Sequence, residues 1–157
     1  MALAIGLALG SASAFAEMSP LDLSSGSAGF ENSPAGGGFM DGYTFSALSS
    51  FTFSSSITSV VNGNRNLNFS SITLTGPAGL FSFNKTLGDP FELWTLQTGT
   101  LAPGSYSLTL LGLNSSSPAS YGGNVSISAV PEPETYALML AGVGVIGFVA
   151  TRRRRRV

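Results

Sequence analysis

The C-terminal end of this chain constrains its folding more than any other segment. Fifteen uncharged and mostly apolar residues run from Tyr136 to Ala150, and five consecutive arginines follow at Arg152–Arg156. A helix from Glu134 to Thr151 would be roughly 27 Å long, close to the ~30 Å thickness of a bilayer core. A segment isolated in lipid must satisfy every backbone group internally, so we expect a transmembrane helix over residues 135–151.

The charges behind this helix indicate its orientation. Arginines clustered next to a membrane span stay on the cytoplasmic side, so the chain N-terminal to Pro131 should lie outside the cytoplasm. Pro131 and Pro133 restrict their neighbours to extended geometry, which predicts an accessible stalk over Val130–Pro133. A plain tail anchor with a proline-containing juxtamembrane loop is the alternative interpretation.

The order of these features is specific. Val130-Pro131-Glu132-Pro133-Glu134, the apolar helix and the basic tail at 152–157 closely resemble the PEP-CTERM sorting signal of Gram-negative bacteria. The resemblance implies that an exosortase, a multipass membrane cysteine protease, recognises Pro131, Glu132 and Pro133 as substrate positions and processes the chain nearby. It also implies that the arginine run (Arg152, Arg153, Arg154, Arg155 and Arg156) retains the chain until processing. The product would then reach the cell surface or extracellular matrix alongside exopolysaccharide.

The N-terminal residues agree with export. Ala2–Gly10 is apolar, and Ala14-Phe15-Ala16 fits the small-x-small cleavage rule, which predicts a signal peptide over residues 1–16. Ala14 and Ala16 would then form the signal peptidase site. No Lys or Arg precedes the apolar stretch, so we expect the natural start to lie upstream with a few basic residues. A buried N-terminal helix is the alternative.

The composition between the two ends limits the possible functions. Glu17 to Val130 comprises 114 residues, enough for one domain with a modest core. The chain has no Cys and no His, which excludes disulfides, thiol nucleophiles and imidazole bases. This segment has six acidic and two basic residues, a net charge of −4, which argues against nucleic acid as a partner. We therefore expect a non-enzymatic protein without cofactor or metal.

The pattern of the middle of the chain is typical of β structure. Apolar residues alternate with Ser, Thr and Asn in several short runs, and Gly, Pro and Asn turns separate these runs. Leu67 and Phe69 are out of phase with Ile72 and Leu74, which predicts a bulge near Ser70-Ser71. We predict an all-β fold, an antiparallel β-sandwich or jelly-roll-like domain over residues 39–129. Residues 17–38 are predicted to form a Gly/Ser-rich lead-in with an edge strand near Leu21–Leu23.

The domain itself carries a second resemblance. Phe39-Met40-Asp41-Gly42-Tyr43 is similar to the Phe-x-Asp-x-Phe opening of one group of PEP-CTERM proteins, with Tyr43 in the last position. That group's later pattern is matched by the stretches Asn66–Gly76, Leu101–Leu108 and Tyr121-x-Gly123. The resemblance implies no biochemical activity. A buried Tyr43 hydroxyl would need a hydrogen-bond partner.

Candidate ligand-binding residues in the domain are few. We interpret Asp41 as a structural aspartate that accepts backbone or hydroxyl hydrogen bonds; a Ca²⁺ site that combines Asp41 with Asp89 or Glu92 is the sharper alternative. Without such a site, we interpret Asp89 and Glu92 as surface charges. The aromatic residues Trp94, Tyr106 and Tyr121 are predicted to lie in the core or on half-exposed strand positions, and a carbohydrate-stacking platform is the alternative.

Together these observations predict a secreted, exosortase-processed protein of the cell surface or extracellular matrix. It would be structural or adhesive, and associated with exopolysaccharide. It would be anchored transiently in the inner membrane, with its domain in the periplasm, before release. Two alternatives remain open: a carbohydrate- or Ca²⁺-binding module, and an envelope protein that stays anchored and is never processed.

Overall fold

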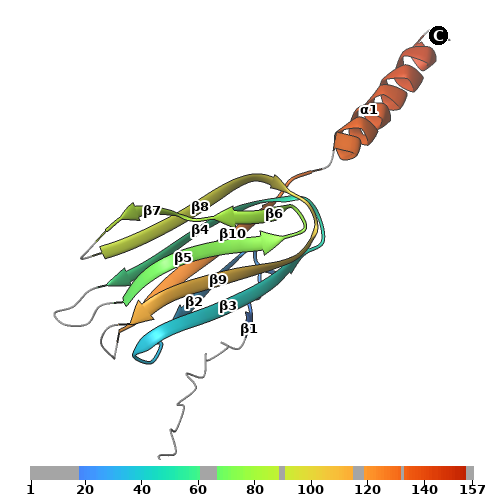
Figure 1. Cartoon of the computed structure of the whole chain (residues 1–157). Helices are drawn as coiled ribbons and strands as arrows, with labels where there is room; N and C mark the ends of the chain where they lie inside the picture. Colours follow the sequence, from blue (N-terminus) through green and yellow to red (C-terminus); the bar gives the residue numbers. More distant parts are fainter. Residues whose placement is uncertain (1–17, 61–66, 89–90, 115–118, 132, 155–157) are drawn as a thin grey trace, which may run out of the picture.

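A computed structural model of the chain describes residues 18–60, 67–88, 91–114, 119–131 and 133–154, and shows two β-sheets packed face to face with one helix beyond them (Figure 1). The strands are β1 (Met18–Pro20), β2 (Ser27–Asn32), β3 (Gly37–Ala47), β4 (Phe51–Val60), β5 (Leu67–Gly76), β6 (Gly79–Ser82), β7 (Asn84–Leu87), β8 (Phe91–Leu101), β9 (Gly104–Asn114) and β10 (Tyr121–Ala129). The helix is α1 (Pro133–Arg154).

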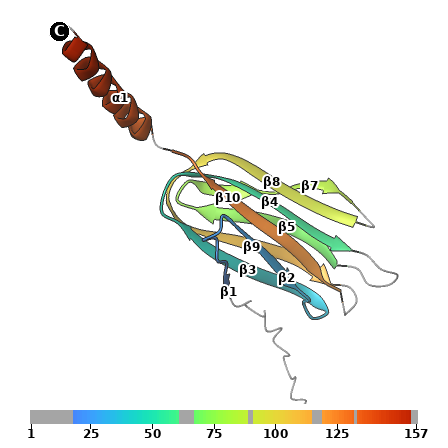
Figure 2. The ribbon, with the colours of Figure 1, turned by 180° about the vertical axis from the view of Figure 1, so that it is seen from behind.

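Each sheet has five strands. The first sheet has the order β1-β3-β9-β5-β6 and the second the order β2-β10-β4-β8-β7 (Figure 2). All neighbouring strands are antiparallel except β1 and β3, which pair in parallel. The predicted all-β sandwich with a C-terminal helix is therefore confirmed. The predicted signal helix falls on residues that precede the described part of the chain.

The alternation in the sequence sets which residues face the interior. Phe51 and Phe53 of β4 are buried, as are Tyr106, Leu108 and Leu110 of β9. In β5 the register against β9 shifts between Phe69 and Ser71, which is the predicted bulge. One extra residue at this point reverses the strand's phase, so the buried residues on both sides of it face the same core: Leu67, Phe69, Ile72 and Leu74.

Aromatic rings fill much of the space between the sheets. The ring of Phe45 stacks against Phe53 at a centroid distance of 5.9 Å and against Tyr106 at 5.4 Å. Phe51 meets Tyr106 edge-on at 5.2 Å. The Tyr106 hydroxyl reaches the edge of the core and donates a 2.7 Å hydrogen bond to the carbonyl oxygen of Ala102. Such stacked and edge-to-face pairs add about 0.5–1.5 kcal/mol each beyond area burial.

The structure differs from the predicted lead-in over residues 17–38. Two edge strands, β1 and β2, lie within this segment, and they flank the predicted edge strand at Leu21–Leu23 instead of coinciding with it. β2 pairs with β10 over six residues and inserts the ring of Phe30 into the core. A Cβ atom at Gly123 would lie 2.4 Å from this ring, so the glycine makes room for Phe30. Tertiary pairing, and not local periodicity, therefore creates β2.

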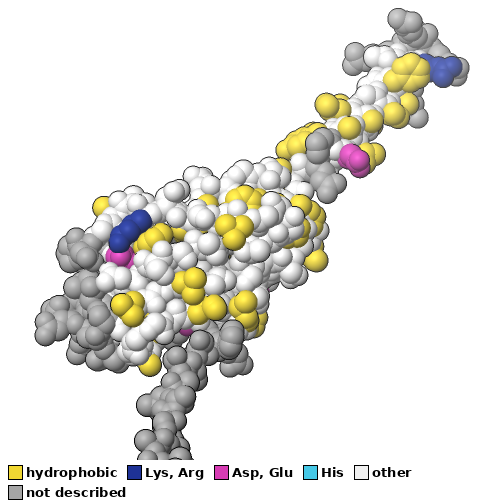
Figure 3. All heavy atoms as spheres, in the orientation of Figure 1, with side chains coloured by type: hydrophobic (Ala, Val, Ile, Leu, Met, Phe, Trp, Pro, Cys, Tyr) yellow, Lys and Arg dark blue, Asp and Glu magenta, His cyan; other side chains and the backbone are white. Residues whose placement is uncertain are grey.

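The strands at the sheet edges are short. β1, β6 and β7 have three, four and four residues and β2 has six, whereas the inner strands have nine to eleven. The surface in view carries few charged side chains and scattered hydrophobic ones (Figure 3). The outer strands cover only part of their longer neighbours, because β1 pairs with β3 at Gly42–Thr44 and β6 pairs with β5 at Thr73–Gly76.

Candidate functional site

The helix α1 has no apolar partner in the sandwich. It projects away from the two sheets in both views (Figures 1 and 2), and all its described side chains, from Glu134 to Arg152, are exposed. Leu138 and Ile146 are 74% and 71% exposed. Within the described residues this is the one helix long and apolar enough to cross a membrane, with a span of Glu134–Arg152 and a mean hydropathy of 1.5. Exposed apolar surface on this scale needs an apolar environment.

The polar groups of α1 also suit a lipid environment. Pro133 occupies the first helical position, where its missing N–H costs nothing. Glu134 lies in the first turn, where a negative charge interacts favourably with the helix dipole. The hydroxyl of Thr151 bonds to the carbonyl oxygens of Gly147 at 3.1 Å and Phe148 at 2.9 Å, so it is satisfied within the helix.

The junction between the sandwich and α1 is short. The backbone N–H of Val130 donates a 2.8 Å hydrogen bond to the carbonyl oxygen of Ser50, in the turn between β3 and β4. Pro131 follows and is exposed, and α1 begins at Pro133. The predicted extended stalk over Val130–Pro133 is thus wrong at both ends: Val130 is bonded to the sandwich, and Pro133 belongs to the helix because proline's fixed φ suits its first turn.

The structure describes only some of the other residues predicted for sorting and processing. Arg152 is exposed, and Arg153 and Arg154 continue the helical backbone beyond the predicted end at residue 151. Glu132, Arg155 and Arg156 lie outside the described ranges, as do Ala14 and Ala16 of the predicted signal peptidase site.

Asp41 sits inside the sandwich, where it bonds to side chains of the opposite sheet. Its Oδ2 atom accepts hydrogen bonds from Asn32 Nδ2 at 2.9 Å and from the Tyr121 hydroxyl at 2.5 Å. The Tyr43 and Tyr121 hydroxyls are 2.9 Å apart. Because the single proton of Tyr121 points to Asp41, Tyr43 is the donor in this pair. This arrangement agrees with our interpretation of Asp41 as a structural hydrogen-bond acceptor.

Burial and bonding shift the proton affinity of both tyrosines. Burial is the main cause of the raised pKa of Tyr121, and the hydrogen bond that its hydroxyl donates to Asp41 raises this pKa further. Burial is also the main cause of the raised pKa of Tyr43. Both hydroxyls therefore stay protonated over the physiological range and act as hydrogen-bond donors.

The stretches that carry the second resemblance meet in the interior. The Phe39 ring packs against the Phe69 ring at 6.0 Å and stacks on the Tyr121 ring at 6.1 Å. A Cβ atom at Gly76 would lie 2.2 Å from the Tyr106 ring, so the end of one stretch must be glycine for another to pack on it. These residues therefore define how the two sheets fit together.

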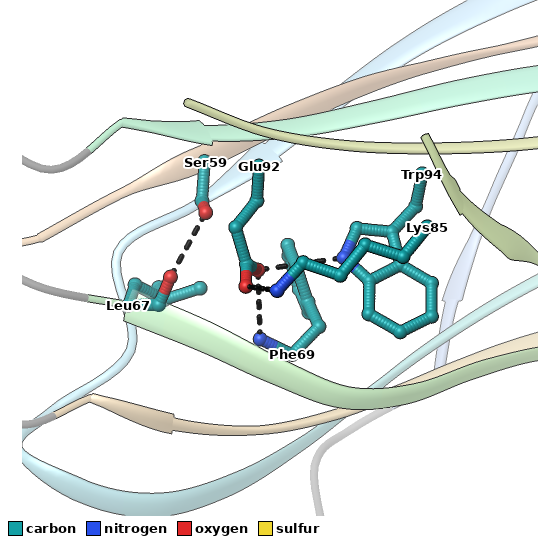
Figure 4. Close-up of polar contacts among 6 residues, drawn as sticks. All are labelled: Ser59, Leu67, Phe69, Lys85, Glu92 and Trp94. Carbon is teal, nitrogen blue, oxygen red and sulfur yellow. Dashed lines mark hydrogen bonds and ion pairs between the residues drawn. The ribbon is translucent and has the colours of Figure 1, made fainter. Parts of the chain in front are cut away.

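Glu92 is the largest departure from the sequence prediction. It is fully buried, whereas the sequence suggested a surface charge. Its Oε1 atom forms an ion pair with Lys85, and its Oε2 atom accepts hydrogen bonds from the backbone N–H of Phe69 at 3.1 Å and from Trp94 Nε1 at 3.4 Å (Figure 4). The bulge at Phe69–Ser71 interrupts the β5–β9 ladder and turns this N–H toward Glu92.

This cluster links the two sheets. Lys85 keeps its side chain 40% exposed and lies 5.8 Å from the centroid of the Trp94 ring. Beside it, the Ser59 hydroxyl of β4 donates a 2.9 Å hydrogen bond to the carbonyl oxygen of Leu67 on β5. A buried carboxylate with three protein donors is satisfied and needs no ligand. The one local signal for the burial of Glu92 is its phase with Leu96, which is also buried, but this phase does not say which face of the strand is the interior.

The structure bears on both alternative binding sites, the Ca²⁺ site and the aromatic platform for carbohydrate. Asp41 and Glu92 each bind protein donors in separate clusters, and the described residues contain no group of three His, Cys, Asp or Glu side chains that could hold a metal. Asp89 lies outside the described ranges. A shared aromatic platform is wrong, because Tyr106 and Tyr121 are 2% and 3% exposed. Both lie in the core, as predicted, and Trp94 is half-buried under Lys85.

A shallow polar hollow of about 570 Å³ opens at the end of the sandwich opposite α1. Its lining includes Glu31, Asn32, Thr58 and the edge of Tyr121. These groups offer hydrogen bonds from a carboxylate, an amide and hydroxyls, which are the groups that sugars use, but the hollow presents no exposed aromatic face.

Comparison with solved structures finds β domains. One is the pre-peptidase C-terminal domain of collagenase from Bacillus anthracis, at 14% identity and a TM-score of 0.45, covering 72% of this chain and 96% of that one. Another is Aeromonas hydrophila PliG, a periplasmic inhibitor of g-type lysozyme, at 19% identity and a TM-score of 0.44, covering 71% and 96%. Likeness at this level carries no argument about function. No curated protein sequence matches the chain.

The C-terminal segment gives a specific match. A sequence model of the PEP-CTERM protein-sorting motif matches residues 129–155, which comprise the end of β10, the junction and α1.

Proposed function

Because the chain carries a PEP-CTERM protein-sorting motif at residues 129–155, we propose that it is the precursor of an exported protein that an exosortase recognises and processes. In this proposal α1 anchors the precursor in the inner membrane, and its arginines hold the C-terminus on the cytoplasmic side. The sandwich lies in the periplasm. Cleavage near Pro131-Glu132-Pro133 then releases it to the cell surface or the surrounding matrix.

The observation that carries this proposal is the position of the last hydrogen bond between the fold and its C-terminal extension. Val130 bonds to Ser50, and the exposed Pro131 begins the Pro131-Glu132-Pro133 segment directly after it. A cut at or beyond Pro131 would leave every strand and every cross-sheet bond intact. The motif and the helix are thus separable from the sandwich without loss of core contacts.

A release assay in an exosortase-containing host tests this proposal. Pro131→Ala/Glu132→Gln/Pro133→Ala should abolish appearance of the domain in the culture supernatant, and the protein should accumulate in the membrane. The matched control is Glu134→Gln, which changes the neighbouring carboxylate and should still be released. Mass spectrometry of the released form should find a C-terminus near residues 130–134. Equal release of the triple variant would leave an unprocessed anchor as the better description.

For the released domain we propose a non-enzymatic, structural or adhesive role in contact with exopolysaccharide. Its support is a hydroxyl-rich outer face on the second sheet, where most of the registered outward residues on β4, β8 and β10 are Ser or Thr: Thr52, Ser54, Ser56, Thr58, Thr95, Thr100, Ser126 and Ser128. Uncharged hydroxyls in this density can exchange hydrogen bonds with a hydrated polymer without any need to desolvate ions.

Retention on immobilised exopolysaccharide tests the role of this face. Ser54→Ala/Ser56→Ala/Thr58→Ala should lower retention, because it removes three outward hydroxyls from β4. The matched control is Ser46→Ala/Thr75→Ala/Ser105→Ala, which removes three exposed hydroxyls from the first sheet. Equal retention of both variants would remove the proposed face from consideration.

A carbohydrate-binding module with a specific pocket is the second candidate, and the polar hollow beside Tyr121 favours it. A glycan array would distinguish the two roles. Saturable binding to one sugar class, lost in Glu31→Ala and Thr58→Ala, would support a pocket, whereas weak binding spread over many polymers would support the matrix role.

A further inference from the structure

The tether between the sandwich and α1 fixes how far the domain can lie from a membrane. Val130 is bonded to Ser50, and α1 begins three residues later at Pro133. Three residues span at most about 11 Å. The interfacial layer of a bilayer is roughly 5–8 Å thick on each side of the hydrocarbon core. The end of the sandwich that carries Val130 must therefore lie within or directly against this layer when α1 spans the core.

Four loops of the sandwich reach this same end. The strand registers place Ala47 opposite Gly104, Phe51 opposite both Leu101 and Ala129, and Gly76 opposite Gly79. Residues 48–50, 77–78 and 102–103 connect the strand ends that these pairs bring together. Residues 21–26 lie at the same end, because the Leu21 N–H bonds to the Thr44 carbonyl oxygen at 2.7 Å and the Ile127 N–H bonds to the Gly26 carbonyl oxygen at 2.8 Å. The loops 77–78 and 102–103 lie next to one another, because a Cβ atom at Gly104 would lie 2.5 Å from the Pro77 ring. Figures 1 and 2 show that α1 leaves the sandwich from this end.

These loops present exposed apolar residues among serines and a single charge. Leu48 forms the tip of one loop and is 99% exposed, with nothing of the sandwich covering it. Pro77, Ala78, Ala102 and Pro103 are all exposed beside it. Beside Leu48 a groove of about 420 Å³ opens at the same end, and Leu21, Leu23, Phe51 and Ile127 line it together with Asp22 and three serines.

The charges of the sandwich avoid this end. Asp22 is the one charged side chain in the four loops, and it accepts a 2.9 Å hydrogen bond from the backbone N–H of Ser24. Glu31 and Lys85 lie toward the opposite end, on strands whose partners there are Tyr121–Gly123 and Trp94. An apolar, charge-poor surface that a short tether holds against a bilayer is suited to insertion at the interface and not to electrostatic attraction.

We propose that this end of the sandwich is a membrane-apposed surface: the four loops lie in the headgroup layer around α1, and Leu48 inserts among the upper acyl chains. The inference rests on the proposed function, since it requires α1 to span a bilayer. Insertion would hold the domain in one orientation and would keep Pro131 at the depth where a protease embedded in the membrane can reach it.

The absence of cysteine in the chain makes a direct test possible. Single-cysteine variants Leu48→Cys, Leu113→Cys and Val145→Cys of the full chain are labelled with the dye NBD and reconstituted into phosphatidylcholine vesicles that contain lipids with a shallow or a deep spin label. Leu113 is the matched control, because it is a leucine 54% exposed near the opposite end of β9.

The expected result is a blue-shifted emission at position 48 and loss of its fluorescence with the shallow quencher, but neither change at position 113. Both changes at 48 should persist at high salt, because insertion is apolar. Position 145 in the middle of α1 should respond to the deep quencher. Equal behaviour of positions 48 and 113, with 145 quenched, would overturn this inference alone.

Two other results have distinct meanings. A label at 145 that no lipid quenches would overturn both the anchor and the inference. A blue shift at 48 that lipid quenchers do not affect, and that fades when the protein is diluted among the vesicles, would overturn the inference in favour of contact with a second copy of the chain.

Discussion

Tyr121 and Asp41 join the two sheets by a 2.5 Å hydrogen bond across the interior. Tyr121 lies on β10 and Asp41 on β3, so the bond connects strands 80 residues apart in sequence. Tyr43 donates to the same hydroxyl at 2.9 Å, and Asn32 donates to the same carboxylate oxygen. Loss of the Tyr121 hydroxyl would therefore leave two buried groups incompletely bonded.

Tyr121→Phe should lower the free energy of unfolding by about 1–3 kcal/mol, because it leaves the Tyr43 hydroxyl without its acceptor and Asp41 with one donor fewer. Chemical denaturation of the full chain in detergent, followed by near-UV circular dichroism, measures the change. The matched control is Tyr136→Phe on α1, where the ring is 53% exposed and stability should not change. Equal effects of the two substitutions would contradict the assigned network.

The same tyrosines predict how stability depends on alkaline pH. Their ordinary pKa is 10.0, and burial raises the pKa of both Tyr43 and Tyr121 in the folded protein. Above pH 10.0 the unfolded chain loses these protons while the folded chain keeps them, so stability is fully present below this pH and declines above it. The slope should be about 1.4 kcal/mol per pH unit for each such tyrosine. Denaturation midpoints at increasing pH measure it, and Tyr121→Phe should reduce the slope.

Two neighbouring glycines provide a test of the β2–β10 pairing. Gly123→Ala places a Cβ atom 2.4 Å from the Phe30 ring and should destabilise the fold by about 1–3 kcal/mol. Gly122→Ala meets its nearest neighbour, the Phe30 carbonyl oxygen, at 3.8 Å and should cost much less. Thermal unfolding of both variants decides the question. If Gly122→Ala proved the more damaging, the placement of Phe30 in the core would be wrong.

The Lys85–Glu92 pair predicts a non-additive double-mutant cycle. Lys85→Met leaves the buried Glu92 carboxylate without its ionic partner and should cost about 1–3 kcal/mol, since water can still reach the half-exposed site. Glu92→Gln keeps an acceptor for the Phe69 N–H but loses the ion pair. The double variant should cost less than the sum of the two single variants. Additive free energies in urea titrations would show that the two residues do not interact.

The arginine run predicts a fixed membrane orientation. In the cysteine-free chain, Val157→Cys should react with an impermeant maleimide only after the inner membrane is permeabilised. Ser56→Cys, on the exposed face of β4, should react in intact spheroplasts and serves as the control. The opposite labelling pattern would place the sandwich in the cytoplasm and exclude exosortase processing.

The sequence predicted those parts of the fold in which apolar and small polar residues alternate. Phe51 and Phe53, and the phase change after Phe69, have a local pattern because each residue faces one side of a sheet. β2 has no such pattern, since Phe30 is its one large apolar residue. Its place depends on β10 and on the space at Gly123, which is 93 residues from Phe30 and beyond the reach of any local pattern.

The candidate sites divide in the same way. The sorting motif is a contiguous segment, so its residues could be identified from their order alone. Glu92 could not, because its partners Lys85 and Phe69 lie on other strands, and the phase shared with Leu96 does not say which face is the interior. Pro133 was ambiguous, because proline fits both an extended stalk and a helix start.

The brevity of the outer strands has a consequence for how copies of the domain meet one another. Open backbone edges are templates for growth into fibrils, and a secreted protein meets many copies of itself without chaperones. The outermost strands have only three to six residues, and they cover part of the longer strands beside them: β1 pairs with three of the eleven residues of β3, and β6 with four of the ten residues of β5. The uncovered backbone of β3 and β5 is therefore the place where a second copy would add a strand.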